Sequence, residues 1–223
     1  MNYAMVGRLI WKDWYFQRGA ILLSLAGGVA SLAIVAFGGK AGFTIGLILL
    51  VTIMVAIGAM LVMATMIEER EQRTLPFIMS LPISYIEYST AKILVNLLIF
   101  VPFWLVLSVG SLAILVAAPT IHGLFAFTAI MAVELLANVC LTLAAALVSE
   151  SKGWTIAAIM VGNLAINVAG YFFAHIPSIA KGLWGSAIQW PPAATISVAA
   201  EFAFIALLLG GAFFIQSRKK DFL

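Results

Sequence analysis

Long uncharged runs, separated by short charged segments, organise this chain. Residues 41–67 carry no charge, and neither does the stretch between Lys92 and Glu134. A helix needs roughly 20 apolar residues to cross about 30 Å of hydrocarbon, and several runs exceed that length. Backbone polar groups in lipid must be satisfied internally, which favours helices, and the short alternating segments of a barrel are missing. The pattern predicts six spans, at about 19–38, 43–67, 93–117, 122–148, 154–175 and 196–217.

The segment before the first span has a pattern of its own. Val6, Ile10 and Trp14 recur at every fourth position, whereas Arg8 and Lys12 lie on another face of the same helix. This spacing predicts a short N-terminal amphipathic helix that lies on the inner surface of the membrane. A solvated tail is the alternative interpretation.

The segment before the last span is apolar but broken. Within residues 176–195, Pro177, Pro191 and Pro192 interrupt the chain. The segment is too short and too interrupted to cross a bilayer, so we expect a short broken helical segment that dips into the outer leaflet.

Composition agrees with these predictions and excludes a soluble domain. The chain is 64% hydrophobic and 9% charged, with a mean hydropathy of +1.15. Soluble domains are about 45–50% apolar and about 25% charged. No repeat, low-complexity tract or second domain is visible, so residues 1–223 are expected to form one transmembrane domain. The net charge of +3 is too small to favour a nucleic-acid partner.

The distribution of basic residues predicts the orientation. With the N-terminus inside, only Lys40 and Lys181 fall on the outer side. The other ten basic residues fall on the inner side: Arg8, Lys12, Arg18, Arg70, Arg73, Lys92, Lys152, Arg218, Lys219 and Lys220. Because Lys and Arg concentrate in cytoplasmic segments, this bias predicts a multi-pass protein of the cell (inner, cytoplasmic) membrane with both termini in the cytoplasm.

The densest charge lies between the second and third predicted spans. Six charged side chains occur there in a short segment: Glu68, Glu69, Arg70, Glu71, Arg73 and Glu87. Both signs are interleaved, and an apolar group from Leu75 to Leu81 follows at once. A solvated linker, the usual fate of a charge run, has no need of that group. The Ser84-x-x-Glu87 spacing is a capping box, which predicts that the third helix begins in the cytoplasm.

These residues carry a resemblance to a known family. The order E-x-x-T-L-P-F-x-x-S-L-P-I-S from Glu71, followed by E-Y-x-x-A-K from Glu87, resembles the permeases of type 2 ATP-binding-cassette (ABC) exporters. The basic-aromatic N-terminus, the six spans, the broken outer segment and the ending from Gln216 are also similar, so the resemblance covers essentially the whole chain. It implies a cytoplasmic coupling helix between spans two and three that binds the ATPase subunit. The residues to which it assigns this contact are Glu68, Glu69, Arg70, Glu71, Gln72, Arg73 and Thr74.

The chain has no evident nucleotide site of its own. The segment nearest to G-x-x-x-x-G-K-[ST] is Gly39-Lys40, which has Ile34 in place of the first Gly and Ala41 in place of Ser or Thr. We therefore expect a non-catalytic permease subunit that holds no cofactor. The resemblance implies two copies of a separate ABC ATPase and a second permease chain, in a homo- or heterodimer.

Polar residues inside the predicted spans are candidates for the substrate path. Glu134 is near the middle of the fourth span, with Asn138 one turn later, and Asn163 and Asn167 repeat that spacing in the fifth. A carboxylate at the bilayer centre costs on the order of 2.5–3.5 kcal/mol, so Glu134 is expected to face protein or water. The alternative for all four residues is hydrogen bonding between helices. For the two residues of the fifth span, that alternative is favoured.

The expected function is the export of an amphipathic or hydrophobic molecule, peptide or drug-like, from the cytoplasm or inner leaflet. The alternative is a stand-alone secondary transporter or channel that uses Glu134 as a proton or ion site. No nucleophile and base occur in a pattern that indicates an enzyme. His122 and His175 are isolated, so no metal site is expected.

Overall fold

A computed structural model describes residues 3–71, 85–183 and 185–218. Within these residues the chain is helical and contains no strand. The elements, in chain order, are α1 (Tyr3–Phe37), α2 (Gly39–Val62), the π-helical turn η1 (Met63–Ile67), α3 (Glu68–Glu71), α5 (Tyr85–Ala117), the 3-10 turn η2 (Pro119–Leu124), α6 (Phe125–Ser149), α7 (Lys152–His175), α8 (Pro177–Ala180) and α9 (Pro192–Arg218).

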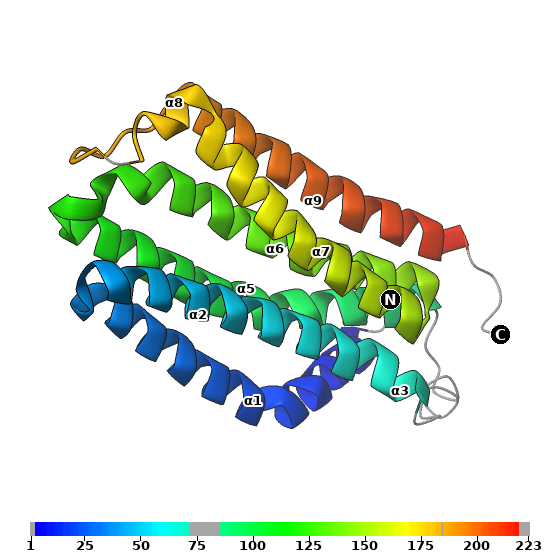
Figure 1. Ribbon diagram of the computed structural model, residues 1–223. Coiled ribbons are helices and arrows are strands. Elements are labelled where there is room, and N and C mark those ends of the chain that lie inside the picture. Colours follow the sequence, from blue (N-terminus) through cyan, green and yellow to red (C-terminus); the bar gives the residue numbers. More distant parts are fainter. Residues whose placement is uncertain (1–2, 72–84, 184, 219–223) are drawn as a thin grey trace.

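Six helices are long and apolar enough to cross a membrane, which confirms the predicted all-α fold and the number of candidate spans. They cover Gly7–Phe37, Ala41–Ile67, Glu87–Ala117, Ile121–Ser149, Lys152–His175 and Pro192–Arg218. They run side by side in one bundle, so that the loops gather at two ends (Figure 1). We call the end that carries α3, Lys92, Lys152 and Arg218 the charged end. The end that carries Gly38, η2 and α8 is the opposite end.

The N-terminal segment is not a separate helix. Residues predicted to form a surface helix are the first turns of α1, which continues without a break to Phe37 because no proline interrupts it. Figure 1 shows the dark-blue start of α1 inclined to the rest of the helix, against the start of α5. That this start lies on a membrane surface stays a prediction.

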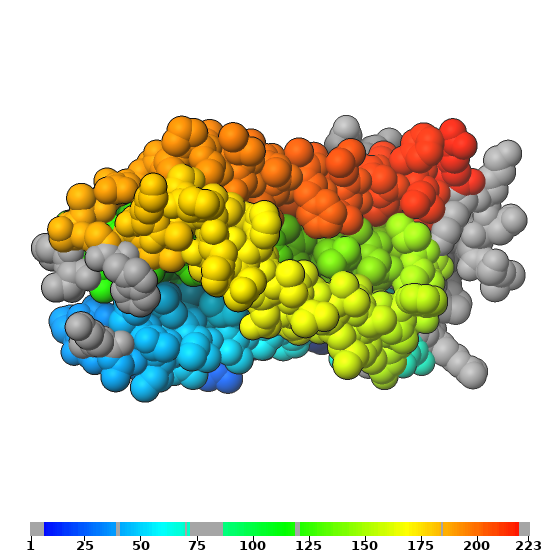
Figure 2. Space-filling model, turned by 45° about the horizontal axis from the view of Figure 1, so that its top comes forward, coloured from blue at the N-terminus to red at the C-terminus, as the bar shows by residue number. Residues whose placement is uncertain are grey.

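Helix α6 is the centre of the bundle. It contacts α2, α5, α7 and α9. Of its most apolar 18-residue stretch, 56% is buried inside the bundle, against 11% for the corresponding stretch of α7 and 17% for that of α9. On the face drawn in Figure 2, green α6 is visible between yellow α7 and the orange to red α9. The largest apolar cluster joins α6 to α2 and α5 through residues such as Met54, Phe100 and Leu136. The sparsely buried α7 exposes large apolar side chains, among them Met160 and Leu164, as a lipid-facing helix does.

Small residues in the first two helices allow close approach between neighbouring helices. A Cβ atom on Gly46 would lie 2.5 Å from Val35 Cγ2 and 2.8 Å from the carbonyl oxygen of Ser31. One on Gly28 would lie 2.6 Å from Leu107 Cδ1. These residues therefore serve helix packing, the usual role of small residues in membrane bundles.

The broken segment before the last span forms one helical turn, α8, at the opposite end of the bundle. Ile179 of α8 is buried against Ala126, Ile130 and Ala194. The following loop is tied to η2 because the Gly123 amide donates to the Gly185 carbonyl at 3.0 Å. A Cβ atom on Gly123 would lie 2.0 Å from the Gly182 carbonyl oxygen, so only glycine fits there.

Candidate functional site

A cavity of about 620 Å³ lies between α2, α5, α6 and α7, within the candidate membrane spans. Its walls are mostly apolar, with Phe127 and Met131 from α6 and Leu47 and Leu50 from α2. No acidic or basic side chain belongs to its lining among the described residues. The polar residues that line it are Thr52, Ser108, Ser111, Thr128, Asn163 and Asn167.

Two of these polar residues are the predicted pair of the fifth span. The amide of Asn167 donates to the Asn163 carbonyl at 2.8 Å, one turn back in the same helix. Asn167 is exposed although it lies in the middle of an apolar helix. Both residues therefore lie where a molecule in the cavity could contact them, and the hydrogen bond from Asn167 to Asn163 stays within α7.

The two serines of α5 differ in their hydrogen bonding. Ser111 is 3% exposed, and its hydroxyl donates to the Ser108 carbonyl at 2.8 Å. Ser108 is 5% exposed, and its Oγ has no hydrogen-bond partner within the described parts of the chain. A serine in a helix usually bonds back to the preceding turn, so a buried hydroxyl that does not is unusual.

The other two predicted path residues do not line this cavity. The side chain of Glu134 lies against that of Glu201 of α9, which is 8% exposed. Asn138 is buried against α7, where a Cβ atom on Gly162 would lie 1.8 Å from its Oδ1. Glu134 and Asn138 of α6 thus contact α9 and α7, and neither belongs to the lining of the cavity.

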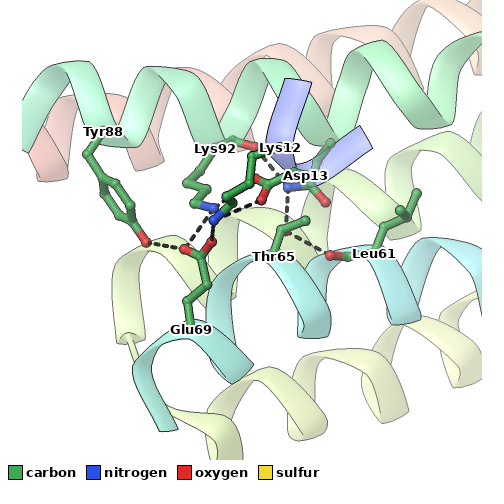
Figure 3. Close-up of polar contacts among 8 residues, drawn as sticks. Lys12, Asp13, Leu61, Thr65, Glu69, Tyr88 and Lys92 are labelled. Carbon is green, nitrogen blue, oxygen red and sulfur yellow. Dashed lines mark hydrogen bonds and ion pairs between the residues drawn. The ribbon is translucent and has the colours of Figure 1, made fainter. Parts of the chain in front are cut away.

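At the charged end, four ionised residues form a buried cluster (Figure 3). Lys92 of α5 is fully buried, and its Nζ lies 2.9 Å from Asp13 Oδ2 and 2.8 Å from Glu69 Oε2. Lys12 of α1 pairs with both carboxylates, through Glu69 Oε1 and, at 3.3 Å, Asp13 Oδ1. The Tyr88 hydroxyl donates to Glu69 at 3.4 Å. Because two positive and two negative groups meet, the charges balance in a site that excludes most water.

A hydrogen-bond chain continues from this ion cluster into the bundle. The amide of Asn96 donates to the Thr65 hydroxyl at 2.9 Å, and that hydroxyl donates to the Leu61 carbonyl at 2.7 Å. Thr65 lies in η1, the π-helical turn that leads from α2 into α3. Such turns occur frequently at functional sites. The ion cluster and this chain together hold α3 to α1 and α5.

The predicted partner-binding segment is described only as far as Glu71. Glu69 is buried in the ion cluster, so its carboxylate contacts this chain's own lysines. Glu68 is exposed, and Glu71 is exposed and pairs with Lys152 of α7 at 3.0 Å. The backbone of Arg70 is helical. The predicted residues Gln72, Arg73 and Thr74, and the capping Ser84, lie outside the described residues.

Sequence reasoning did not single out several residues of these sites. Asp13 and Lys92 are 79 positions apart, and no local pattern pairs them. The one available signal was that Asp13 is the only acid near the N-terminus, among Arg8, Lys12 and Arg18. Ser108 and Ser111 carry no signal in an apolar run. The proximity of Glu201 to Glu134 likewise joins two residues that are far apart in the sequence.

The ring nitrogens of both histidines lie close to backbone carbonyl oxygens. The ring nitrogens of His122 lie 3.1 Å from the Ser186 carbonyl and 3.0 Å from the Val116 carbonyl. His175 Nδ1 lies 2.7 Å from the Tyr171 carbonyl. No group of three or more His, Cys, Asp or Glu side chains suited to a metal ion occurs in the described portion of the sequence.

Comparisons with protein-family models, with curated proteins and with solved structures found no match for this chain. Its class therefore comes from the fold and the composition. The chain is an all-helical protein whose six apolar helices fit a multi-pass membrane protein. Its buried ion cluster is at one end of the bundle, and its uncharged cavity lies among the spans.

Proposed function

We propose that this chain is the membrane-spanning subunit of an ATP-driven exporter of the type 2 ABC class, paired with a second permease chain and driven by two copies of a separate ATPase. The exported molecule is amphipathic or hydrophobic and enters from the cytoplasm or the inner leaflet. The proposal places the chain in the cell membrane with both termini in the cytoplasm, because the basic residues are so unevenly distributed.

The observation that carries this proposal is the attachment of α3 to the spans. We call the charged segment between the second and third spans, which begins at Glu68, the charged loop. An ATPase that moves this loop can drive transport only if the loop is mechanically joined to the helices. Glu69 of α3 binds Lys12 of α1 and Lys92 of α5, so a displacement of α3 acts on two spans at once. Rigid joints of this kind allow small shifts to become changes between two packings of a bundle.

The division of charge along α3 supports the same function. Glu69 faces inward and Glu68 faces outward, which separates an anchoring side of the segment from a side that a partner can reach. Glu71 forms an exposed pair with Lys152. Exposed pairs contribute about 0–1 kcal/mol, so a partner can replace this one.

The test is co-purification of the ATPase with variants of the charged loop. Reversal of both charges, Glu71→Arg with Arg73→Glu, is expected to release the ATPase or uncouple its turnover from transport, because charged contacts set register and partner choice. Lys152→Gln is the matched control, since it breaks the internal pair of Glu71 but leaves the loop intact. Full binding and full transport by the double reversal would reduce the loop to a solvated linker and end the proposal.

A second candidate function is a stand-alone proton-coupled carrier. The observation that favours it is that the carboxyl groups of Glu134 and Glu201 lie against one another within two candidate membrane spans. Intramembrane carboxyl groups are frequent in proton relays. Proton-driven uptake by vesicles that contain this chain without any ATPase, abolished in Glu134→Gln, would favour the carrier. ATP-dependent transport that Glu134→Gln leaves intact would exclude it.

A further inference from the structure

Two arginines and two aromatic residues share the outer face of the first turns of α1. Arg8, Trp11, Tyr15 and Arg18 follow one another at intervals of three and four positions, so they lie on one side of the helix. All four side chains are exposed, Trp11 by 68% and Tyr15 by 51%. Asp13 lies on the opposite side and is buried against the bundle. We call the four exposed residues the arginine face.

The arginine face is positive, and no acid of α1 offsets its charge. Asp13 is the only acidic residue of this helix, and it pairs with Lys92 inside the bundle. Neither arginine forms an ion pair with a residue in the described parts of the chain. Arg18 stacks on Tyr15, with its Cζ 4.1 Å from the ring centroid. Because stacking uses the flat face of the guanidinium, the N–H groups in its plane can still bind the oxygens of an anion.

The length of α1 puts the arginine face at the level of lipid headgroups. The candidate span Gly7–Phe37 is about 46 Å long at 1.5 Å per residue, whereas the hydrocarbon core of a bilayer is about 30 Å thick. Arg18 lies about 28 Å from Phe37 along the helix, so the turns before Arg18 extend beyond the hydrocarbon. These turns are inclined to the rest of α1 (Figure 1), which keeps them closer to the headgroups than a straight helix would. Tryptophan and tyrosine are enriched at this depth.

We propose that the arginine face binds anionic phospholipids, with Arg8 and Arg18 on headgroup phosphates and the rings of Trp11 and Tyr15 beside the upper parts of the acyl chains. The two arginines are about 15 Å apart along the helix, so each binds its own headgroup. Complementary charge selects this occupant, and the acyl chains cover apolar side chains such as Leu22, which is 60% exposed one turn further along α1. Such binding requires neither transport nor an ATPase, so it is independent of the proposed exporter.

The test is native mass spectrometry of the full chain, purified in detergent and freed of lipid, with two lipids of identical acyl chains. Phosphatidylglycerol has a net negative charge, whereas phosphatidylcholine carries the same phosphate but is neutral overall. The readout is the ratio of their affinities, in which the amount of folded protein cancels. We expect the unmodified chain to prefer phosphatidylglycerol. The double variant Arg8→Gln with Arg18→Gln is expected to lower the ratio about fivefold, because each headgroup loses a cation that contributes about that factor.

The matched control removes two positive charges from outside the arginine face. Lys152 and Lys181 are both exposed, and Lys152 is paired with Glu71 of this chain. The double variant Lys152→Gln with Lys181→Gln is therefore expected to leave the ratio unchanged. A second arm adds an excess of glycerol 3-phosphate, which has the anionic group without acyl chains and is expected not to displace phosphatidylglycerol.

Equal binding of the two lipids by the unmodified chain, or an unchanged ratio in the double arginine variant, would overturn the proposal. An equal fall in the double lysine control would show that net charge alone sets the preference, which overturns it as well. Displacement by glycerol 3-phosphate would make the ligand a free phosphate ester instead of a lipid. The same spectra report the oligomeric state, so a dimer lost in the arginine variant without a change in the lipid ratio would assign this face to a second copy of the chain. None of these results depends on an ATPase, so they leave the co-purification test of the proposed function unaffected.

Discussion

At the residue scale, Lys92 is the side chain on which the charged end depends most. It is fully buried, and its Nζ bridges the carboxylates of Asp13 and Glu69, which come from two other segments of the chain. A buried ion pair adds little net stability over apolar residues of the same shape, but removal of one partner strands the others without compensation. Lys92 therefore holds α1, α3 and α5 together, and its replacement weakens the attachment of all three helices.

Replacement of Lys92 by methionine is expected to destabilise the protein by about 3–5 kcal/mol, because two carboxylates lose their buried counter-ion. Lys12→Met is expected to have a smaller effect, since the Lys12 side chain is 38% exposed. The measurement is thermal unfolding of the purified variants in detergent.

A rescue experiment distinguishes stranded charge from lost packing. Adding Glu69→Gln to Lys92→Met removes one stranded carboxylate and is expected to recover part of the stability. If the double variant is instead less stable than Lys92→Met by the full effect of Glu69→Gln alone, the two residues act independently and the cluster is not an energetic unit.

At the scale of the helices, close approach between pairs of elements determines the packing. Because Gly46 has no side chain, α1 packs closely against α2. Because Gly162 has none, the side chain of Asn138 reaches the surface of α7. Helices α6 and α7 follow one another through a short connection in which Glu150 adopts a left-handed conformation with φ of 55°. That turn reverses the chain, and the contact at Gly162 then determines how closely the two helices pack along the cavity wall.

Gly162→Ala is expected to destabilise the protein by about 1–3 kcal/mol, because the added Cβ atom overlaps Asn138 Oδ1 in a packed interface. Asn138→Ala should restore much of this loss, and the interaction term of the double-mutant cycle is the quantity to measure. Gly210→Ala in α9 is the control, since nothing lies within 4 Å of a Cβ atom there. Equal effects of the two alanine substitutions would show that the contact is unimportant.

At the scale of the whole molecule, the bundle separates its basic residues from its opposite end. Lys12, Lys92 and Lys152 pair with acidic residues at the charged end, and α9 ends there at Arg218. The opposite end carries Lys181 in the described segments, next to α8. This distribution agrees with the proposed orientation, since basic segments are usually retained in the cytoplasm.

Single cysteines at Lys40 and Lys181, in a Cys140→Ala background, are expected to react with a membrane-impermeant thiol reagent applied from outside. Cysteines at Arg73 and Lys152 should react only after the membrane is permeabilised. The native Cys140 is buried, so its removal has little effect on the labelling pattern. External labelling at Arg73 would reverse the proposed orientation.

The sequence by itself determined the class of fold and the places where charge occurs. An uncharged apolar run as long as residues 41–67 indicates a helix that spans lipid or is deeply buried. Such a run can be recognised from consecutive residues alone. The number of candidate spans and the gathering of charge around Glu68–Glu71 both followed from neighbours along the chain. The continuity of α1 did not, because a short amphipathic pattern carries no information about where its helix ends.

Only the tertiary structure decided which residues act together. Asp13, Glu69 and Lys92 belong to three segments, and their pairing depends on how α1, α3 and α5 meet. The same holds for the cavity, where Ser108 and Asn167 come from helices that are not neighbours in sequence. Hydropathy reports whether a segment prefers lipid to water, and six such segments can be arranged in many ways. The free energy that selects one arrangement lies in contacts between residues far apart in the chain, and composition and spacing do not encode it.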